Sequence, residues 1–349
     1  MRLPLIELGL ALLWFSQATA ADQTLVRYEA SHNAMATDYT IVAYGKDRDY
    51  LAEVINEAFE QIDRLDAQMS NYKPESELSR INREAYGHAV LVEPGLFRLI
   101  QDAICYGEET HGAFDISVGP LMKAWGFFQG PGRRPPQAEL AEILGHVGYR
   151  HVKLDAASRT VKFDQQGIEL DLGGIAKGYA VDQAVEILRE NHVGSALVSS
   201  GTSSIYALGA PPGERGWKVT LRDPFEAKKV GDVVFLRNYS MSISANYERS
   251  FRIGGKTYGH IMNPRTGMPV EDTLTTAVLA PSTRQSDALT KPAFVLGVTG
   301  MQPYLQTHAN LTVMFYLPSN REKGYRRIVS RSASYSVNDG ALAEIAGEP

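Results

Sequence analysis

The chain has 349 residues, of which 44% are hydrophobic and 21% are charged, and its formal net charge at pH 7 is −5. This composition is typical of a globular protein and excludes a largely disordered chain. The charges form no long run of one sign, so the sequence gives no indication of nucleic-acid binding. A single cysteine, Cys105, excludes an internal disulfide and multi-cysteine zinc or iron–sulfur sites. Its apolar neighbours predict a buried position on a helix face.

The first twenty residues have the pattern of an export signal. Arg2 precedes a short apolar run, Leu8 to Phe15, and Ala18-Thr19-Ala20 offers a cleavage site. The run is too short for a mature membrane-spanning helix, although an uncleaved N-terminal anchor stays an alternative. We therefore expect a signal peptide at 1–20 and one domain at 21–349. No cysteine stands directly after the run, so we expect an exported, periplasmic protein that is not a lipoprotein.

Apolar periodicity then predicts a mixture of helices and hairpin-like strands. Strands around a turn are expected at 25–43, and an amphipathic helix at 50–69. The later expected helices are 96–107, 176–190 and a segment opening near Ser286. The later expected strands are 152–154, 160–163, 168–172, 196–199, 205–208, 217–221, 233–235, 240–244 and 275–279. This order favours an α+β fold with a mostly antiparallel sheet.

The segment from Asp171 to Gly178, Asp-Leu-Gly-Gly-Ile-Ala-Lys-Gly, is the strongest local signal. Paired glycines allow close approach of a ligand, and the start of a helix offers free N–H groups to an anion. Lys177 adds positive charge, and Asp171 can accept hydrogen bonds. A tight structural turn with a surface lysine explains the same pattern.

Two further motifs carry groups suited to proton or metal chemistry. The Asn-Pro turn in His260-Ile-Met-Asn-Pro-Arg-Thr-Gly267 places His260 at a strand end, where an imidazole can shuttle protons or simply bond the turn. Asp287, in Ser-Asp-Ala-Leu-Thr-Lys291, is expected to be either a helix N-cap or a metal ligand. Tyr72, on a polar loop, can stack on a flat ring or be an ordinary surface tyrosine.

The order of these motifs resembles the ApbE family, the FAD:protein FMN transferases, from about Met35 to about Gly297. The resemblance includes Met35-Ala-Thr37 (commonly Met-Gly-Thr), Ser70-x-Tyr-x-x-x-Ser-Glu-Leu78, Phe114-Asp-x-x-Val-Gly-Pro-Leu121, the 171–178 segment, Tyr247-Glu-Arg249, the 260–267 segment and Asp287-Ala-Leu289. It implies a T-fold-like α+β architecture and transfer of FMN from FAD to a threonine or serine of an acceptor flavoprotein. Such an acceptor would belong to a membrane electron-transfer complex.

The resemblance also implies roles for individual residues. The expected FAD-binding residues are Met35, Tyr72, Ala113, Phe114, Asp115, Asp171, Lys177 and Ile261. Gly174 and Asp287 would hold Mg²⁺ at the pyrophosphate of FAD, which is the substrate. His260 would lie near the reacting phosphate, where the chemistry of the reaction favours a base for the acceptor hydroxyl, and Asp287 would act with it in catalysis.

The chain departs from the family pattern beside the expected metal site. The family position for a further metal ligand, commonly threonine, is Lys291, and Arg284 stands where some members have aspartate. A protonated lysine cannot ligate Mg²⁺. This leaves open whether Mg²⁺ is used, with FAD hydrolysis and non-catalytic flavin binding as alternatives to transfer.

Overall fold

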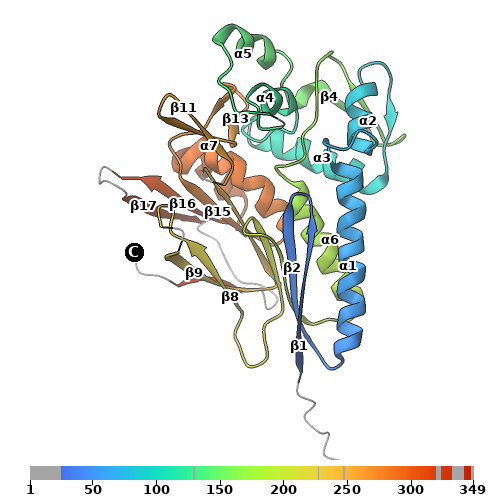
Figure 1. Ribbon diagram of the computed structural model, residues 1–349, viewed down its shortest axis with the longest axis vertical. Coiled ribbons are helices and arrows are strands. Elements are labelled where there is room, and N and C mark those ends of the chain that lie inside the picture. The colour runs from blue at the N-terminus through green and yellow to red at the C-terminus, as the bar shows by residue number, and fades with distance from the viewer. Residues whose placement is uncertain are drawn as a thin grey trace, which may run out of the picture.

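A computed structural model gives the fold of the chain (Figure 1). It describes residues 25–128, 130–226, 228–246, 248–319, 324–331 and 342–346. The expected signal peptide at 1–20 lies outside the described residues. Within them, no helix combines the length and apolar character that a membrane crossing needs.

An eight-stranded sheet runs through the centre of the molecule (Figure 1). Each strand is antiparallel to its neighbours. In spatial order the strands are β1 (Val26–Ala34), β2 (Thr37–Gly45), β6 (Ser195–Ser200), β7 (Ser204–Leu208), β10 (Tyr239–Ala245), β15 (Thr275–Ala280), β16 (Thr312–Pro318) and β17 (Tyr325–Arg331). The predicted antiparallel α+β fold is therefore confirmed.

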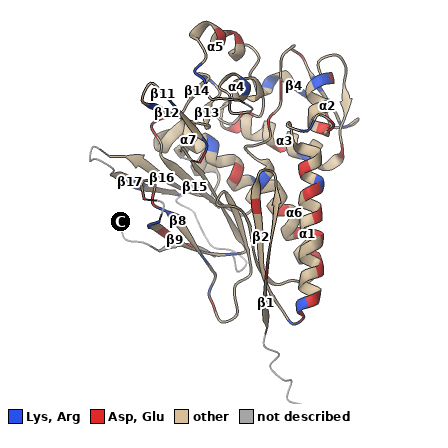
Figure 2. Ribbon diagram, viewed as in Figure 1, with Lys and Arg blue, Asp and Glu red and all other residues tan. Residues whose placement is uncertain are grey.

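Three long helices cover one face of this sheet: α1 (Arg48–Met69), α6 (Ala176–Glu190) and α7 (Thr283–Thr307) (Figure 1). The apolar side chains of α1 recur at helical spacing, and all of those used for the prediction are buried against the sheet and α6. Acidic residues outnumber basic ones on the rest of α1 (Figure 2). The helices predicted at 50–69 and 176–190 are confirmed.

A smaller sheet packs on the opposite face. It consists of β8 (Trp217–Arg222), β9 (Val230–Arg237) and β18 (Leu342–Ala346). Alternate residues of β8 and β9 are buried in one apolar cluster with Met241, Leu279 and Tyr316 of the central sheet. This period-2 pattern is what a half-buried strand requires.

The remaining elements gather at one end of the molecule, above the first turns of α6 and α7 (Figure 1). The helices are α2 (Glu77–Glu84), α3 (Pro94–Glu109), α4 (Gly119–Ala124), α5 (Gln137–Leu144) and the short η1 (Tyr149–His151). The strands are β3 (Val90–Leu91), β4 (Val152–Asp155), β5 (Thr160–Phe163), β11 (Ser250–Ile253), β12 (Lys256–Gly259), β13 (Met262–Asn263) and β14 (Met268–Pro269). They bring several polar loops together at the edge of the main core.

Three sequence predictions were wrong. Alternate residues of the segment 168–172 are buried, but the segment forms no regular strand, because its backbone bonds the side chain of Asn82 and the backbone of Ile116 rather than a sheet ladder. Cys105 is exposed, with its thiol directed to Glu109 on the outer face of α3. The N-cap of α7 is Ser282, so Asp287 lies inside the helix rather than capping it.

Candidate functional site

The loops at this end enclose a cavity of about 980 Å³. This volume is at the upper end of the range for cofactor sites, about 300–1,000 Å³. Segments from the β1–β2 turn to α7 contribute to its walls. The predicted residues that line it are Met35, Tyr72, Ala113, Phe114, Asp115, Asp171, Gly174, Lys177, His260, Ile261 and Lys291. Asp287 lies behind the lining and has no exposed surface.

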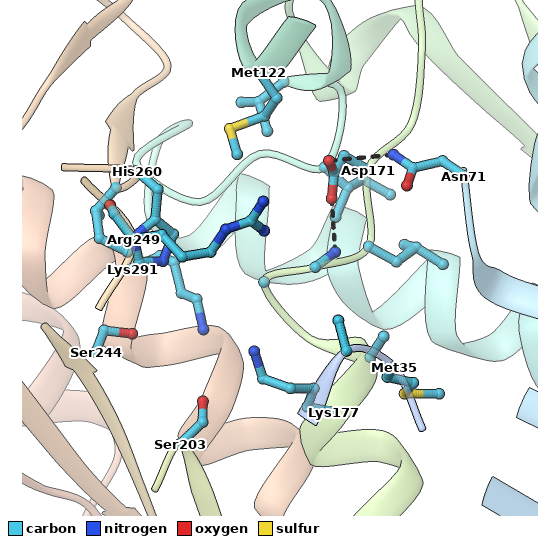
Figure 3. A pocket seen from close by; sticks show the side chains of 18 of the residues that line it. Met35, Asn71, Met122, Asp171, Lys177, Ser203, Ser244, Arg249, His260 and Lys291 are labelled. Carbon is cyan, nitrogen blue, oxygen red and sulfur yellow. Dashed lines mark hydrogen bonds between the residues drawn. The ribbon is translucent and has the colours of Figure 1, made fainter. Parts of the chain in front are cut away.

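Asp171 lies at the entrance to the turn that precedes α6. Its Oδ1 accepts a hydrogen bond from the N–H of Gly173 at 2.7 Å, and its Oδ2 accepts one from Asn71 at 3.2 Å (Figure 3). These bonds fix the carboxylate at the cavity wall, where it is only partly buried. A carboxylate held in this way can accept further bonds from a ring N–H or a sugar hydroxyl.

The N-terminus of α6 binds an anion, but that anion belongs to the protein. The N–H of Gly178 donates to Oδ2 of Asp287 on α7 at 2.9 Å. A Cβ on Gly178 would lie 2.6 Å from that of Asp287, so only glycine permits the contact. The predicted anion site at this helix start is therefore occupied, in part, by Asp287 itself.

Lys291 neutralises the buried carboxylate. One helical turn after Asp287, its ammonium lies 2.5 Å from Oδ1 and 2.9 Å from the backbone oxygen of Asp287. This spacing and order, with the acid first, is favourable in a helix. Burial lowers the pKa of Lys291, and the carboxylate of Asp287 opposes that shift.

The ammonium group of Lys177, from the first turn of α6, points toward the same part of the cavity as that of Lys291 (Figure 3). Arg249 also extends into the cavity and donates to the carbonyl of Phe127 at 2.8 Å. Burial raises the pKa of Glu248, while Lys177 and Lys291 oppose that shift. The floor of the cavity therefore carries three basic side chains against the single carboxylate of Glu248, and this cationic region is suited to phosphate groups.

His260 lies beside this cationic region, at the end of β12. Burial lowers its pKa to about 3, with smaller contributions from Lys177 and Lys291. The imidazole is therefore neutral near pH 7. A neutral imidazole can accept a proton, which the base role requires.

Tyr72 and Phe128 form an aromatic pair at the rim. Their ring centroids are 4.3 Å apart with an angle of 11° between the planes, and Tyr72 is 46% exposed. Asp115 differs from the other expected wall residues, because its buried carboxylate accepts bonds from Ser117 and the N–H of Tyr149. Its side chain fixes the loop rather than offering a free acceptor.

Several cavity residues were not predicted as site residues. They include Asn71, Met122, Ser203, Ser244, Glu248 and Arg249. Glu248 and Arg249 belong to the Tyr-Glu-Arg motif, and Asn71 precedes Tyr72, so their positions in recognised motifs were an available signal.

The sequence of this chain is similar to those of known proteins. The chain matches the model of the ApbE family over residues 35–315. The chain belongs to the ApbE family. It is 32% identical to an FAD:protein FMN transferase of Treponema pallidum over 292 residues, 79% of this chain and 80% of the relative. It is 30% identical to one of Klebsiella pneumoniae over 297 residues, 84% of this chain and 90% of the relative.

Solved structures of ApbE proteins share the fold. The ApbE protein of Thermotoga maritima superposes with a TM-score of 0.79 at 28% identity, covering 88% of this chain and 98% of that one. The flavin transferase ApbE of Vibrio cholerae gives a TM-score of 0.78 at 24% identity, covering 89% and 98%. The second likeness supports the fold alone.

The residues at the ApbE metal position do not fit Mg²⁺ in this chain. Both carboxylate oxygens of Asp287 already accept hydrogen bonds, and its backbone oxygen accepts from Lys291 and from the hydroxyl of Thr290. Within the described ranges, no group of three or more His, Cys, Asp or Glu residues is arranged to hold a metal. Arg284, expected beside this site, pairs with Asp102 at 2.5 Å and does not line the cavity.

Proposed function

We propose that this protein cleaves FAD and attaches its FMN part to a threonine or serine hydroxyl of an acceptor flavoprotein, releasing AMP. The observation that carries the proposal is the juxtaposition in one cavity of a cationic floor, a neutral histidine and a fixed acceptor carboxylate. Membership of a family whose relatives bear this activity in their names supports it.

The pyrophosphate of FAD would lie on the cationic floor. Lys177, Lys291 and Arg249 would bind its oxygens with charge-assisted hydrogen bonds. Cleavage of a pyrophosphate increases negative charge on the departing phosphate, and fixed cations stabilise that charge in the transition state. The negative charge on the departing phosphate would develop where the side chains of Lys177, Lys291 and Arg249 converge.

The transfer requires one bond to form and one to break. The acceptor hydroxyl oxygen attacks the phosphorus of the FMN part, and the bond from that phosphorus to the bridging oxygen breaks. AMP leaves with the bridging oxygen, and a phosphoester remains on the acceptor. The hydroxyl proton passes to the free nitrogen of His260, which burial, with smaller contributions from Lys177 and Lys291, keeps unprotonated beforehand.

The isoalloxazine ring would lie nearer the rim. Tyr72 offers an aromatic face, and Met35, Phe114 and Ile261 offer apolar surface. Asp171 would accept a hydrogen bond from FAD, held in place by Asn71. These assignments follow the family roles and are part of the proposal.

The acceptor and the compartment are proposals of the same kind. An acceptor exposing its threonine or serine on a membrane electron-transfer complex would meet the enzyme in the periplasm. Export through the signal at 1–20 would supply that location. The mature N-terminus, read by mass spectrometry, tests it: a start at Ala21 supports cleavage, and intact Met1 on cytoplasmic protein contradicts export.

The activity is tested with the mature protein, FAD and a candidate acceptor domain. We expect flavin fluorescence on the denatured acceptor and release of an equal amount of AMP. AMP without labelled acceptor, across several acceptors, would favour FAD hydrolysis. Bound FAD with neither product would identify a flavin-binding protein without transfer activity.

A further inference from the structure

A buried carboxylate needs a cation beside it. Asp287 has no exposed surface, and an ionised carboxylate in such a place is costly unless it is paired and hydrogen-bonded. The ammonium of Lys291, at 2.5 Å, supplies the charge, and Gly178 and Thr290 supply further contacts to this residue. The ammonium of Lys291 therefore balances the charge of the Asp287 carboxylate without any other cation.

The same ammonium also faces the ligand. Lys291 lines the cavity and its side chain keeps 19% of its surface exposed, whereas Asp287 behind it keeps none. The Cε of Lys291 is 3.6 Å from the point where a Cβ on Gly174 would lie, so the side chain passes directly beside the glycine turn. The ammonium of Lys291 therefore bonds the buried carboxylate of Asp287 and also faces the part of the cavity above the glycine turn.

A divalent cation would have to displace this group. Lys177 points to the same region, so a metal ion would enter beside two ammonium groups while the oxygens of Asp287 are already bonded (Figure 3). Like charges at short range repel each other strongly where the dielectric constant is low. The site therefore favours the ammonium of Lys291 over a divalent cation.

We propose that the ammonium of Lys291 is the cation of this site, binding the pyrophosphate of FAD in place of Mg²⁺. This proposal rests on the proposed function for the identity of the ligand. It makes Lys291 a phosphate-binding residue and predicts that the protein needs no divalent metal to bind FAD or act on it. The lysine is part of the chain, so this site needs no cation from solution.

The first test uses the unaltered protein. FAD affinity, followed by quenching of flavin fluorescence, is compared in excess chelator and in excess Mg²⁺, and Mg²⁺ binding to the apoprotein is measured by calorimetry. We expect equal FAD affinity in both solutions and no Mg²⁺ binding. Loss of FAD affinity in chelator, or Mg²⁺ binding to the apoprotein, overturns the proposal.

Substitution provides the second test. Lys291→Thr should bind FAD about 10- to 100-fold more weakly in chelator, the range expected for a lost charged hydrogen bond. Added Mg²⁺ should restore much of that loss and should bind the variant in calorimetry. Lys291→Met, which removes the charge but adds no oxygen ligand, should be weakened without rescue. Lys153→Thr, on the surface beside Asp164, is the matched control and should change nothing. Unchanged FAD affinity in Lys291→Thr and Lys291→Met contradicts the proposal.

The two proposals fail in different ways. Metal-independent FAD binding that Lys291→Met weakens, with neither AMP nor labelled acceptor, supports the role of Lys291 and contradicts transfer. Labelled acceptor that forms only with Mg²⁺ supports transfer and contradicts the role of Lys291. If Lys291→Thr does not fold, the chelator comparison on the unaltered protein still decides.

Discussion

Nδ1 of His260 lies 3.2 Å from the backbone oxygen of Arg249. A carbonyl oxygen only accepts hydrogen bonds, so Nδ1 must carry the hydrogen, and Nε2 has the free lone pair. The backbone N–H of His260 bonds the same carbonyl at 3.0 Å, which fixes the residue further. This pairing determines which ring nitrogen can take a proton from an acceptor hydroxyl.

The protonation of His260 should depend on whether FAD is bound. Burial, with Lys177 and Lys291, lowers its pKa to about 3, so the apoprotein should show no His260 titration between about pH 5 and pH 8. Pyrophosphate would offset the two lysines and raise that pKa. NMR of the ring resonances checks both states, and a His260 inflection near pH 6 to 7 in the apoprotein would contradict the assignment.

The same shift makes His260 a contributor to acid sensitivity. Its pKa falls from 6.5 to about 3 on folding, so the unfolded chain binds a proton that the folded chain does not. The protonation of His260 therefore costs the folded protein nothing above pH 6.5, and the free energy of unfolding declines as pH falls from 6.5 towards 3. His260→Asn should therefore flatten the decline of unfolding free energy over that range, measured by urea titration. His88→Asn, at an exposed position, is the control.

Asp171 should contribute to FAD affinity through its fixed carboxylate. We expect Asp171→Ala to weaken FAD binding about 10- to 100-fold, the range for a hydrogen bond to a charged group. Asn71→Ala should weaken it less, because the bond from Gly173 still positions the carboxylate. Fluorescence titration measures both, with thermal unfolding as a check on folding. Equal affinity in Asp171→Ala and the parent would remove Asp171 from the FAD site.

Long periodic segments were predictable from the sequence because their patterns report burial directly. The stripe of α1 and the limits of α6 agree with their predictions, since tertiary packing and local preference favour the same structure. The segment 168–172 has the composition of a strand, but Asn82, far away in sequence, provides its backbone partners. No local pattern contains that information.

The candidate site likewise has features that local sequence predicts and features that depend on residues far away in the chain. Motif order identified many of the residues that line the cavity, but not how their charges pair. Lys291 was expected beside a metal ligand, yet the ammonium itself bonds Asp287. Arg284 is close to Asp287 in sequence, but its guanidinium extends to Asp102 on α3. Side-chain direction on a helix depends on the neighbouring element, which sequence spacing does not give.

The turn between β1 and β2 holds a strained alanine. Met35 and Ala36 have φ values of 48° and 58°, the left-handed values that a two-residue hairpin turn requires. Glycine adopts this conformation without a Cβ penalty, so Ala36→Gly should raise the free energy of unfolding by about 0.5–1 kcal/mol. Ala52→Gly, inside α1, should lower it by about 1 kcal/mol. Urea unfolding measures both, and destabilisation of similar size in both variants would contradict strain at Ala36.

The contact between α6 and α7 should not tolerate a methyl group at Gly178. A Cβ there would lie 2.4 Å from the backbone oxygen of Thr283 and 2.6 Å from the Cβ of Asp287. Backbone atoms cannot rotate away, so the helices must separate, and Gly178→Ala should cost about 1–3 kcal/mol. Gly194→Ala is the matched control, because no atom lies within 4 Å of its Cβ position. Separation of the helices would also lengthen the bond from Gly178 to Asp287 and move Lys291, so Gly178→Ala should lose FAD affinity as well as thermal stability. A variant that keeps both would show that this close approach of the two helices does not position the cation.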